Sequence, residues 1–407
     1  MGSSAIDTEV SLQKLQAKIA PLIKHIFLLI FSIAPFGLLY GIDSKHPINR
    51  YANLEVKPSN KAAKVLKIGV VGLVHTHVHW ILGREQKGDI EIVAIVEPNK
   101  KLASAYAKQH GFSMDIVYDS MEEMIENTNV EAVTAFNTIY DHLEVVKFCA
   151  PKGIHVMVEK PLAVSLEHAL EMRELAKKHQ IHLLTNYETS WYKSLYTAYD
   201  AVNHKEKLGE VSKMVFRTGH MGPIEIGCNP EFLEWLTDPF LNGGGALTDF
   251  GCYGANITTW ILNGELPYSV SCTTQQIKPE MYPKVEDEAT IVLAYPSKQI
   301  VIQASWNWPM HIKDTKIYGK KGYLHSKNKD ELSFTKVDTY REQNMTTASL
   351  PPGTDDPFAL LQKVVHENYK LTAFDPSSIE NNMIVMKILH AAKISARSNQ
   401  TVLWKNL

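Results

Sequence analysis

A regular alternation of short apolar runs with helical stretches, from Lys64 to Tyr187, most constrains the fold of this chain. The apolar runs are VLKIGVVGL, IEIVAIVE, VEAVTAFN, IHVMVEK and IHLLTNY, and segments such as KKLASAYAKQHG and SLEHALEMRELAKKHQ separate them. Strands that alternate with helices in this way form a parallel sheet covered by helices on both faces. The sequence therefore predicts an α/β domain with a doubly wound parallel sheet, whose ligands bind at the carboxyl ends of the strands.

Composition narrows the remaining possibilities. At 407 residues the chain is long enough for two domains with hydrophobic cores. Its formal charge of −2 gives no basic excess to match a phosphate backbone, so nucleic acid is not an expected partner. The four cysteines include no CxxC pair, which argues against a zinc knuckle. In the second half, runs such as EATIVLAYP and QIVIQASWNW alternate like sheet strands, and we expect an α+β domain there.

An apolar stretch near the amino terminus, IFLLIFSIAPFGLLY, follows basic residues and precedes polar sequence. This layout is typical of an export signal. The stretch is shorter than the roughly 20 residues that a membrane-spanning helix needs. We therefore predict a signal peptide over residues 1–41 and a linker over 42–64. The expected location is periplasmic or secreted, with membrane contact only through this export segment; a cytoplasmic location is the alternative.

The sequence IGVVGLVHTHVHW stands where a dinucleotide-binding loop would follow the first strand. Gly72 occupies the first glycine position of a G-x-G-x-x-G pattern, whereas Val74 and His77 replace the second and third glycines. A side chain at the second position pushes a pyrophosphate outward or requires a different loop path. The loop is therefore interpreted as a modified cofactor loop.

The end of the second strand supports the same interpretation. Glu97 lies where an acidic side chain accepts hydrogen bonds from a ribose hydroxyl, which favours NAD over NADP. Lys100 and Lys101 follow closely and partly offset the repulsion of a 2′-phosphate, so NADP is the alternative cofactor.

Three histidines, His75, His77 and His79, alternate within this loop. In a strand they would share one face, as zinc ligands do. After a glycine turn the backbone is expected to enter a helix, where residues two apart point in different directions, so the three imidazoles should not converge. We therefore predict no metal site, and we expect His75 and His77 to contact the cofactor in place of the missing glycine amides.

A second motif, VMVEKPLAVSLEHALEM, places Glu159 and Lys160 at the carboxyl end of the fourth strand. A lysine at a strand end is most often a solvated charge. Beside a bound nicotinamide, however, an ammonium stabilises the alkoxide charge that develops when a carbinol loses hydride. Lys160 is therefore a candidate catalytic residue.

The Glu-Lys-Pro string, together with GGGALTDFGCYGANITTWILNG over residues 243–264, resembles the Gfo/Idh/MocA oxidoreductase family, named for glucose-fructose oxidoreductase and inositol dehydrogenase. The resemblance implies a Rossmann-like NAD(P)-binding domain, for which we take residues 65–187. It also implies an α+β domain, taken as 188–407, with an open-faced, mostly antiparallel sheet that lines the substrate site and makes subunit contacts. A homo-oligomer, either a dimer or a tetramer, is expected because an open sheet face needs covering.

Within the second string, Asp249, Tyr253 and Asn256 stand at i, i+4 and i+7 and would share one helical face. The resemblance implies that Tyr253 and Lys160 form an acid/base pair. We expect the ammonium to lower the pKa of this phenol from its ordinary value near 10. Asp249 is expected to orient the substrate and Asn256 to bind it. The alternative is a helix whose polar face is merely solvated.

Other candidates are weaker. Asn137 and His142 follow the third strand and match a family segment near the nicotinamide. Aromatic and imidazole side chains can line a sugar pocket, and we take Tyr187, His220 and Trp308 as substrate-binding candidates, although each alone is more often a core residue.

These residues together predict hydride transfer between NAD and a ring carbinol of a sugar, polyol or glycoside. An exported protein meets no free NAD pool, so its cofactor would stay bound and be restored in each cycle. Either a second substrate is reduced, or a transient ketone permits elimination of a glycosidic group. The third alternative, suggested by Val74 and His77, is a cofactor-free sugar-binding protein on the same fold.

Overall fold

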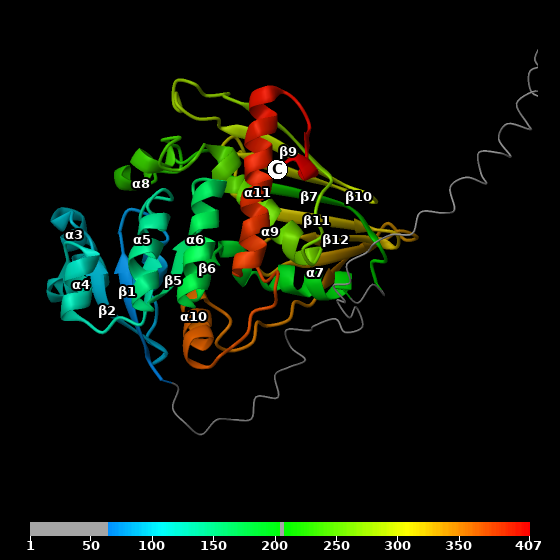
Figure 1. Cartoon of the computed structure of the whole chain (residues 1–407). Helices are drawn as coiled ribbons and strands as arrows, with labels where there is room; N and C mark the ends of the chain where they lie inside the picture. The colour runs from blue at the N-terminus through cyan, green and yellow to red at the C-terminus, as the bar shows by residue number, and fades with distance from the viewer. Residues whose placement is uncertain (1–63, 204–206) are drawn as a thin grey trace, which may run out of the picture. The chain divides into compact units, whose positions relative to one another are not determined.

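The computed structural model describes residues 64–203 and 207–407 (Figure 1). The predicted signal peptide and nearly all of the predicted linker lie outside the described residues. Among the helices of the described part, none has both the length and the apolar character needed to cross a membrane.

The amino-terminal part of the described chain forms a parallel sheet in the strand order β3-β2-β1-β4-β5-β6. Its strands are β1 (Leu66–Val71), β2 (Ile90–Val96), β3 (Val117–Tyr118), β4 (Ala132–Ala135), β5 (His155–Glu159) and β6 (Leu183–Asn186). The central strands are buried on both faces, as the continuous apolar runs predicted. The predicted doubly wound α/β sheet is confirmed.

Helices follow most of these strands. They are α2 (Val78–Leu82), α3 (Lys100–His110), α4 (Met121–Asn127), α5 (His142–Cys149) and α6 (Leu166–His179). Three of them begin at a residue whose side chain accepts a backbone N–H of the first turn, namely Asn99, Ser120 and Ser165. Helix α2 has only five residues, so the segment after β1 is mostly loop, and this loop carries His75 and His77.

The second sheet has nine strands in the order β14-β13-β12-β11-β7-β10-β9-β8-β15. Its strands are β7 (Val211–Gly219), β8 (Ser269–Gln275), β9 (Glu288–Tyr295), β10 (Lys298–Ser305), β11 (Ile312–Gly319), β12 (Gly322–Ser326), β13 (Leu332–Lys336), β14 (Glu342–Met345) and β15 (Val402–Leu403). Only the β7–β10 pair among them is parallel, which confirms the predicted mostly antiparallel sheet. In β9 buried residues alternate with partly exposed ones, so one face of this strand is packed and the other is more open.

The packed face is covered mainly by α9 (Ala246–Ile261), which crosses β7, β9 and β10 and is buried along its whole length. A Cβ at Gly254 would lie 2.7 Å from the Ile302 side chain, so glycine allows the helix to approach the sheet closely. The other helices of this part are α7 (Lys193–Asn203), α8 (Pro230–Leu236), α10 (Pro357–His366) and α11 (Ile379–Ser398).

The last two long helices also touch the first sheet. Helix α11 packs against α9 and β8 and contacts α6, while α10 contacts β1 and β2. The segment assigned by sequence to the second domain therefore returns to the parallel sheet before the chain ends. Figure 1 shows α6, α9 and α11 as neighbours at this junction.

Candidate active site

The turn after β1 requires glycine at its first position. Gly72 has a φ of +80°, and a Cβ there would lie 2.7 Å from the backbone nitrogen of Asn137, just after β4. Its N–H donates to the carbonyl of Val96. Val74, at the second glycine position, packs partly buried against the core, and its carbonyl lies 3.5 Å from the indole nitrogen of Trp235. The loop therefore takes a path that accommodates a side chain at this position.

Glu97 joins the loops that follow β1 and β2. Its carboxylate accepts the N–H of Leu73 at 3.0 Å and the N–H of Asn99 at 2.9 Å. Burial raises the pKa of Glu97, and these two hydrogen bonds oppose that rise. Each carboxylate oxygen keeps a further acceptor position, so the group at the predicted ribose site has capacity for a hydroxyl.

Two of the three loop histidines converge, which corrects the sequence-based expectation. The rings of His75 and His77 lie 4.6 Å apart, and Nδ1 of His77 lies 2.9 Å from the Glu159 carboxylate. Both residues precede α2, so helical geometry does not separate them. His79 lies inside the helix and pairs instead with His110 at 2.8 Å.

One potential ligand atom each from His75, His77 and Glu159 lies within 4.8 Å of the others, an arrangement that suits a metal ion. The hydrogen bonding argues against it. Nδ1 of His75 accepts the N–H of His77, and burial lowers the pKa of His75 well below 6.5, so the neutral ring carries its proton on Nε2. A protonated nitrogen is a hydrogen-bond donor and does not ligate a metal.

Several buried polar atoms near the ends of β1 and β4 have no hydrogen-bond partner among the described residues. They include Nε2 of His75, Nε2 of His142 and Oδ1 of Asn137. In His142, Nδ1 lies 3.1 Å from the Leu162 carbonyl and so carries the proton, which leaves Nε2 as an acceptor; burial lowers the pKa of this ring to about 4. Buried polar atoms are normally paired. A donor and two acceptors at the strand ends therefore fit a polar ligand such as NAD, together with the turn at Gly72.

Lys160 connects the two sheets. Its ammonium donates to Oδ1 of Asp249 at 2.5 Å and to the Asp249 carbonyl at 3.2 Å. The other carboxylate oxygen, Oδ2, accepts the indole N–H of Trp306 at 3.0 Å. This ion pair is buried, and Asp249 raises the pKa of Lys160 against the opposing effect of burial. Lys160 therefore stays an ammonium, held in place by the Asp249 carboxylate.

Tyr253 lies beside this pair but is not acidified by it. The Lys160 nitrogen is 5.4 Å from the centre of the phenol ring. Burial raises the pKa of Tyr253 well above 10, and Glu188 and Asp249 raise it further. The expected lowering of the Tyr253 pKa by Lys160 was wrong, because burial of the phenol, and after it the surrounding negative groups, raise this pKa. At neutral pH Tyr253 holds its proton.

Asn256 does not face the site, which corrects its assignment as a substrate-binding residue. Its amide nitrogen donates to the Pro376 carbonyl at 2.8 Å and to Asn381 at 3.0 Å. These bonds tie α9 to the start of α11. The i+7 spacing is right for one face of a helix, but this helix is buried on every side, so its polar residues meet different partners.

Of the remaining substrate-binding candidates, Tyr187 lies near Tyr253 and His220 near Asp249, whereas Trp308 lies beside Gly219 at the end of β7. Tyr187 packs edge-on against Tyr253 at 5.6 Å, and its hydroxyl has no partner among the described residues. His220 is buried, and burial lowers the pKa of its ring to about 4. Asp249 lies close enough to oppose this shift. The indole nitrogen of Trp308 is buried and unpartnered in the described part of the chain. Their roles in binding remain predictions.

Comparison with known proteins identifies the chain. A model described as "Oxidoreductase family, NAD-binding Rossmann fold" matches residues 66–187, and a "GFO/IDH/MocA C-terminal domain" model matches residues 197–325. The chain belongs to the Gfo/Idh/MocA oxidoreductase family. It is therefore an NAD(P)-dependent oxidoreductase, and NAD is the cofactor of its first domain.

Related proteins cover part of the chain. Trans-1,2-dihydrobenzene-1,2-diol dehydrogenase of Xenopus tropicalis is 26% identical over 236 residues, 58% of this chain and 67% of that protein. A 1,5-anhydro-D-fructose reductase of Ensifer adhaerens is 25% identical over 197 residues, 48% of this chain and 56% of that protein. The matched region thus spans about two thirds or less of these relatives.

Solved structures share the fold at low identity. An aldose-aldose oxidoreductase of Caulobacter crescentus, crystallised with glycerol, has a TM-score of 0.70 at 19% identity and covers 84% of this chain and 100% of its own. An inositol dehydrogenase homologue of Azotobacter vinelandii, crystallised with NADH and myo-inositol, has a TM-score of 0.70 at 17% identity, with coverages of 84% and 98%.

The sequence analysis missed an ion pair in this family member. Lys313 on β11 pairs with Glu188, directly after Tyr187, and the Lys313 nitrogen lies 4.8 Å from the centre of the Tyr253 ring. Glu188 also accepts the hydroxyl of Tyr192 at 2.5 Å. The sequence signal that could have indicated this ion pair is Glu188, a charged residue just beyond the buried strand β6. The pairing with β11 depends on the tertiary fold.

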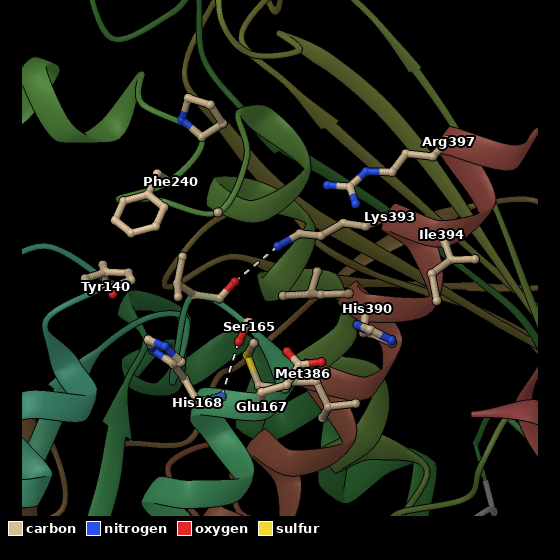
Figure 2. Close-up of a pocket in the computed structure, with 15 residues that line it drawn as sticks. Tyr140, Ser165, Glu167, His168, Phe240, Met386, His390, Lys393, Ile394 and Arg397 are labelled. Atoms are coloured by element: carbon tan, nitrogen blue, oxygen red, sulfur yellow. Dashed lines mark hydrogen bonds between the residues drawn. The ribbon is translucent and has the colours of Figure 1, made fainter.

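A cavity of about 440 Å³ lies next to the Lys160 loop, between the start of α6, the turn at Gly243 and α11. Figure 2 shows Lys393 and Arg397 extending into it from α11, with the Lys393 ammonium 3.4 Å from the Val164 carbonyl. Neither Lys160 nor Tyr253 lines this cavity, so it is distinct from the cluster of candidate catalytic residues.

Proposed function

We propose that the protein transfers hydride between NAD and a ring carbinol of a sugar, polyol or glycoside, with Lys160 and Tyr253 handling the reacting oxygen. The observation that carries the proposal is the convergence of a buried ammonium and a buried phenol, from different domains, beside the strand ends that fit NAD. The sugar and polyol names among the relatives support this substrate class.

Lys160 and Asp249 supply the electrostatic part of this chemistry. An ammonium fixed by Asp249 and held away from water stabilises negative charge on a nearby substrate oxygen without rearranging during the reaction. Asp249 is held in turn by Trp306, so both partners keep one orientation. Bound NAD supplies the hydride acceptor or donor.

Tyr253 supplies the proton. Because its pKa lies well above 10, the phenol is protonated at neutral pH and acts as a general acid toward an oxygen that gains negative charge when a carbonyl is reduced. The reverse reaction, oxidation of a carbinol, requires the substrate proton to pass to this phenolate.

Export, if it occurs, would require NAD that stays bound between turnovers. A redox-neutral reaction then becomes the second candidate. In such a reaction the sugar carbinol would be oxidised to a ketone with its hydride passing to bound NAD⁺, and a base would remove the acidified proton next to the carbonyl. The glycosidic group would then depart and take up a proton, and the same hydride would return to the carbonyl carbon. The ion pair Lys313–Glu188 favours this candidate, because elimination needs a base besides Lys160 and Tyr253.

The test is to denature the purified protein and identify any released nucleotide by mass spectrometry, then to assay the native protein without added cofactor. If net redox occurs, adding free sugars would change the absorbance of the bound nucleotide at 340 nm. If elimination occurs, aryl glycosides would release their aryl group. Absence of nucleotide, with no binding on titration with NADH, would instead support a cofactor-free sugar-binding protein.

A further inference from the structure

We propose that Lys313 and Glu188 are a positioning pair that controls whether Tyr253 gives up its proton, an inference that rests on the proposed role of Tyr253. The pair comes from two elements that the sequence separates widely. Glu188 begins the 3-10 turn after β6, and Lys313 is the second residue of β11. The fold brings both against the phenol.

The geometry places opposite charges near one ring. The Lys313 nitrogen lies 4.8 Å from the centre of the Tyr253 ring, closer than the Lys160 nitrogen at 5.4 Å. Lys160 is bound by Asp249, a carboxylate that also raises the pKa of Tyr253. Lys313 is bound by Glu188 in the same way. The phenol therefore sits between two lysine–carboxylate pairs.

The pair is shielded from solvent. The Lys313 side chain is 6% exposed, and the Glu188 side chain is 27% exposed. Charges in such surroundings act strongly on a near neighbour, because water screens them little. Glu188 raises the pKa of Tyr253, which shows that its field reaches the phenol.

Other titratable and charged groups also face Tyr253 and contribute to its pKa. They are Glu159 and Lys160 from the end of β5, Asp249 and Cys252 from α9, Tyr187 from the end of β6, and the pair Glu188 and Lys313 itself. Among these, Glu188 and Lys313 are bound to each other, so each can be neutralised while the separate ion pair of Lys160 and Asp249 stays intact.

The sign of each substitution follows from the charges. Glu188→Gln removes a negative charge and leaves Lys313 uncompensated, so the phenolate becomes more stable and the pKa of Tyr253 falls. Lys313→Met removes the positive charge and leaves Glu188, so the pKa rises. An opposite charge at 4–6 Å typically shifts a pKa by 1–3 units. We expect shifts of about one unit or more, in opposite directions.

The experiment is NMR of the full protein carrying tyrosine labelled with carbon-13 at Cζ, with the Tyr253 resonance assigned from Tyr253→Phe. Between pH 7 and 11 we expect the resonance to titrate at lower pH in Glu188→Gln than in the wild type, and to remain that of the neutral phenol in Lys313→Met. The double variant Lys313→Met with Glu188→Gln, which buries no unpaired charge, is expected to lie between them.

Glu265→Gln is the matched control, because Glu265 pairs with Lys298, whose nitrogen lies 5.8 Å from the ring of Tyr295. This remote pair should leave the Tyr253 resonance unchanged. A Glu188→Gln protein whose Tyr253 titrates as in the wild type, or a Lys313→Met protein whose Tyr253 titrates earlier, overturns the proposal. The readout needs no substrate, so failure of hydride transfer would be seen separately as the absence of a 340 nm change.

Discussion

Single hydrogen bonds give each histidine of the loop after β1 a different role. His75 is a neutral donor through Nε2, His77 contacts Glu159, and His79 pairs with His110. The sequence predicted that the three rings would diverge, because a helix was expected directly after the glycine turn. The difference arises because the loop is neither strand nor helix up to α2, so no periodic rule predicts where each ring points.

His75→Phe is expected to weaken NAD binding by about tenfold. The substitution keeps a ring between Phe232 and Trp235 but removes the buried N–H that has no partner among the described residues. A buried hydrogen bond of this kind contributes roughly 1–2 kcal/mol. Fluorescence titration with NADH measures the change.

His79→Phe is the matched control from the adjoining helix α2, because its imidazole faces His110. It should bind NADH as the wild type does. Equal affinities for His75→Phe and the wild type would show that this donor does not contact the cofactor.

Among the secondary-structure elements, helix α9 contains residues whose positions were predicted correctly from the sequence and one that was not. The motif correctly suggested that Asp249 and Tyr253 approach Lys160, because strand ends and a family string both constrain them. It assigned Asn256 wrongly, because the packing of α11 against α9 involves residues more than a hundred positions away. The ion pair of Lys313 and Glu188 was not predicted for the same reason, because its two residues are far apart in the sequence.

Asn256→Ala should lower the free energy of unfolding by about 2 kcal/mol, since it leaves the Pro376 carbonyl and Asn381 with one partner fewer inside the protein. Urea denaturation of the variant, of Asn381→Ala and of the double variant forms a double-mutant cycle. We expect the two losses to be less than additive. A large rise in KM with unchanged stability would restore Asn256 to the substrate site.

For the whole molecule, local periodicity predicted the parallel sheet of the first domain and strands in the second. The mostly antiparallel type of the second sheet was implied by the family resemblance. The sequence did not predict that α10 and α11 return to the first sheet, which is decided by long-range packing. The ion pair of Lys160 and Asp249 joins the end of β5 in the first sheet to α9, which covers the second. The homo-oligomer expected from the open sheet face remains a prediction, which light scattering after gel filtration tests.

The stability of the whole molecule should fall on acidification below about pH 6.5. The pKa of buried His142 is about 4 in the folded protein and 6.5 when unperturbed, so protons bind the unfolded chain first. Its stabilising contribution is complete above pH 6.5 and is lost as the pH falls through 4.

Urea denaturation at pH 7.5, 5.5 and 4.5 measures this contribution as the difference between wild type and His142→Gln. That difference should shrink by roughly 1.4 kcal/mol per pH unit between pH 6.5 and 4. Taking the difference removes the effect of other groups, including Glu97 and Glu286, whose raised pKa values act in the opposite direction. A difference independent of pH would mean that His142 is not buried as a neutral ring.

The most direct test of the catalytic assignment is the rate at which NADH held by the protein is oxidised, followed at 340 nm, when a panel of keto-sugars is added. We expect the wild type to respond to at least one sugar, and Lys160→Met and Tyr253→Phe to be slower by roughly a hundredfold or more while still binding NADH. Wild-type rates in Tyr253→Phe, with NADH bound, would contradict the account.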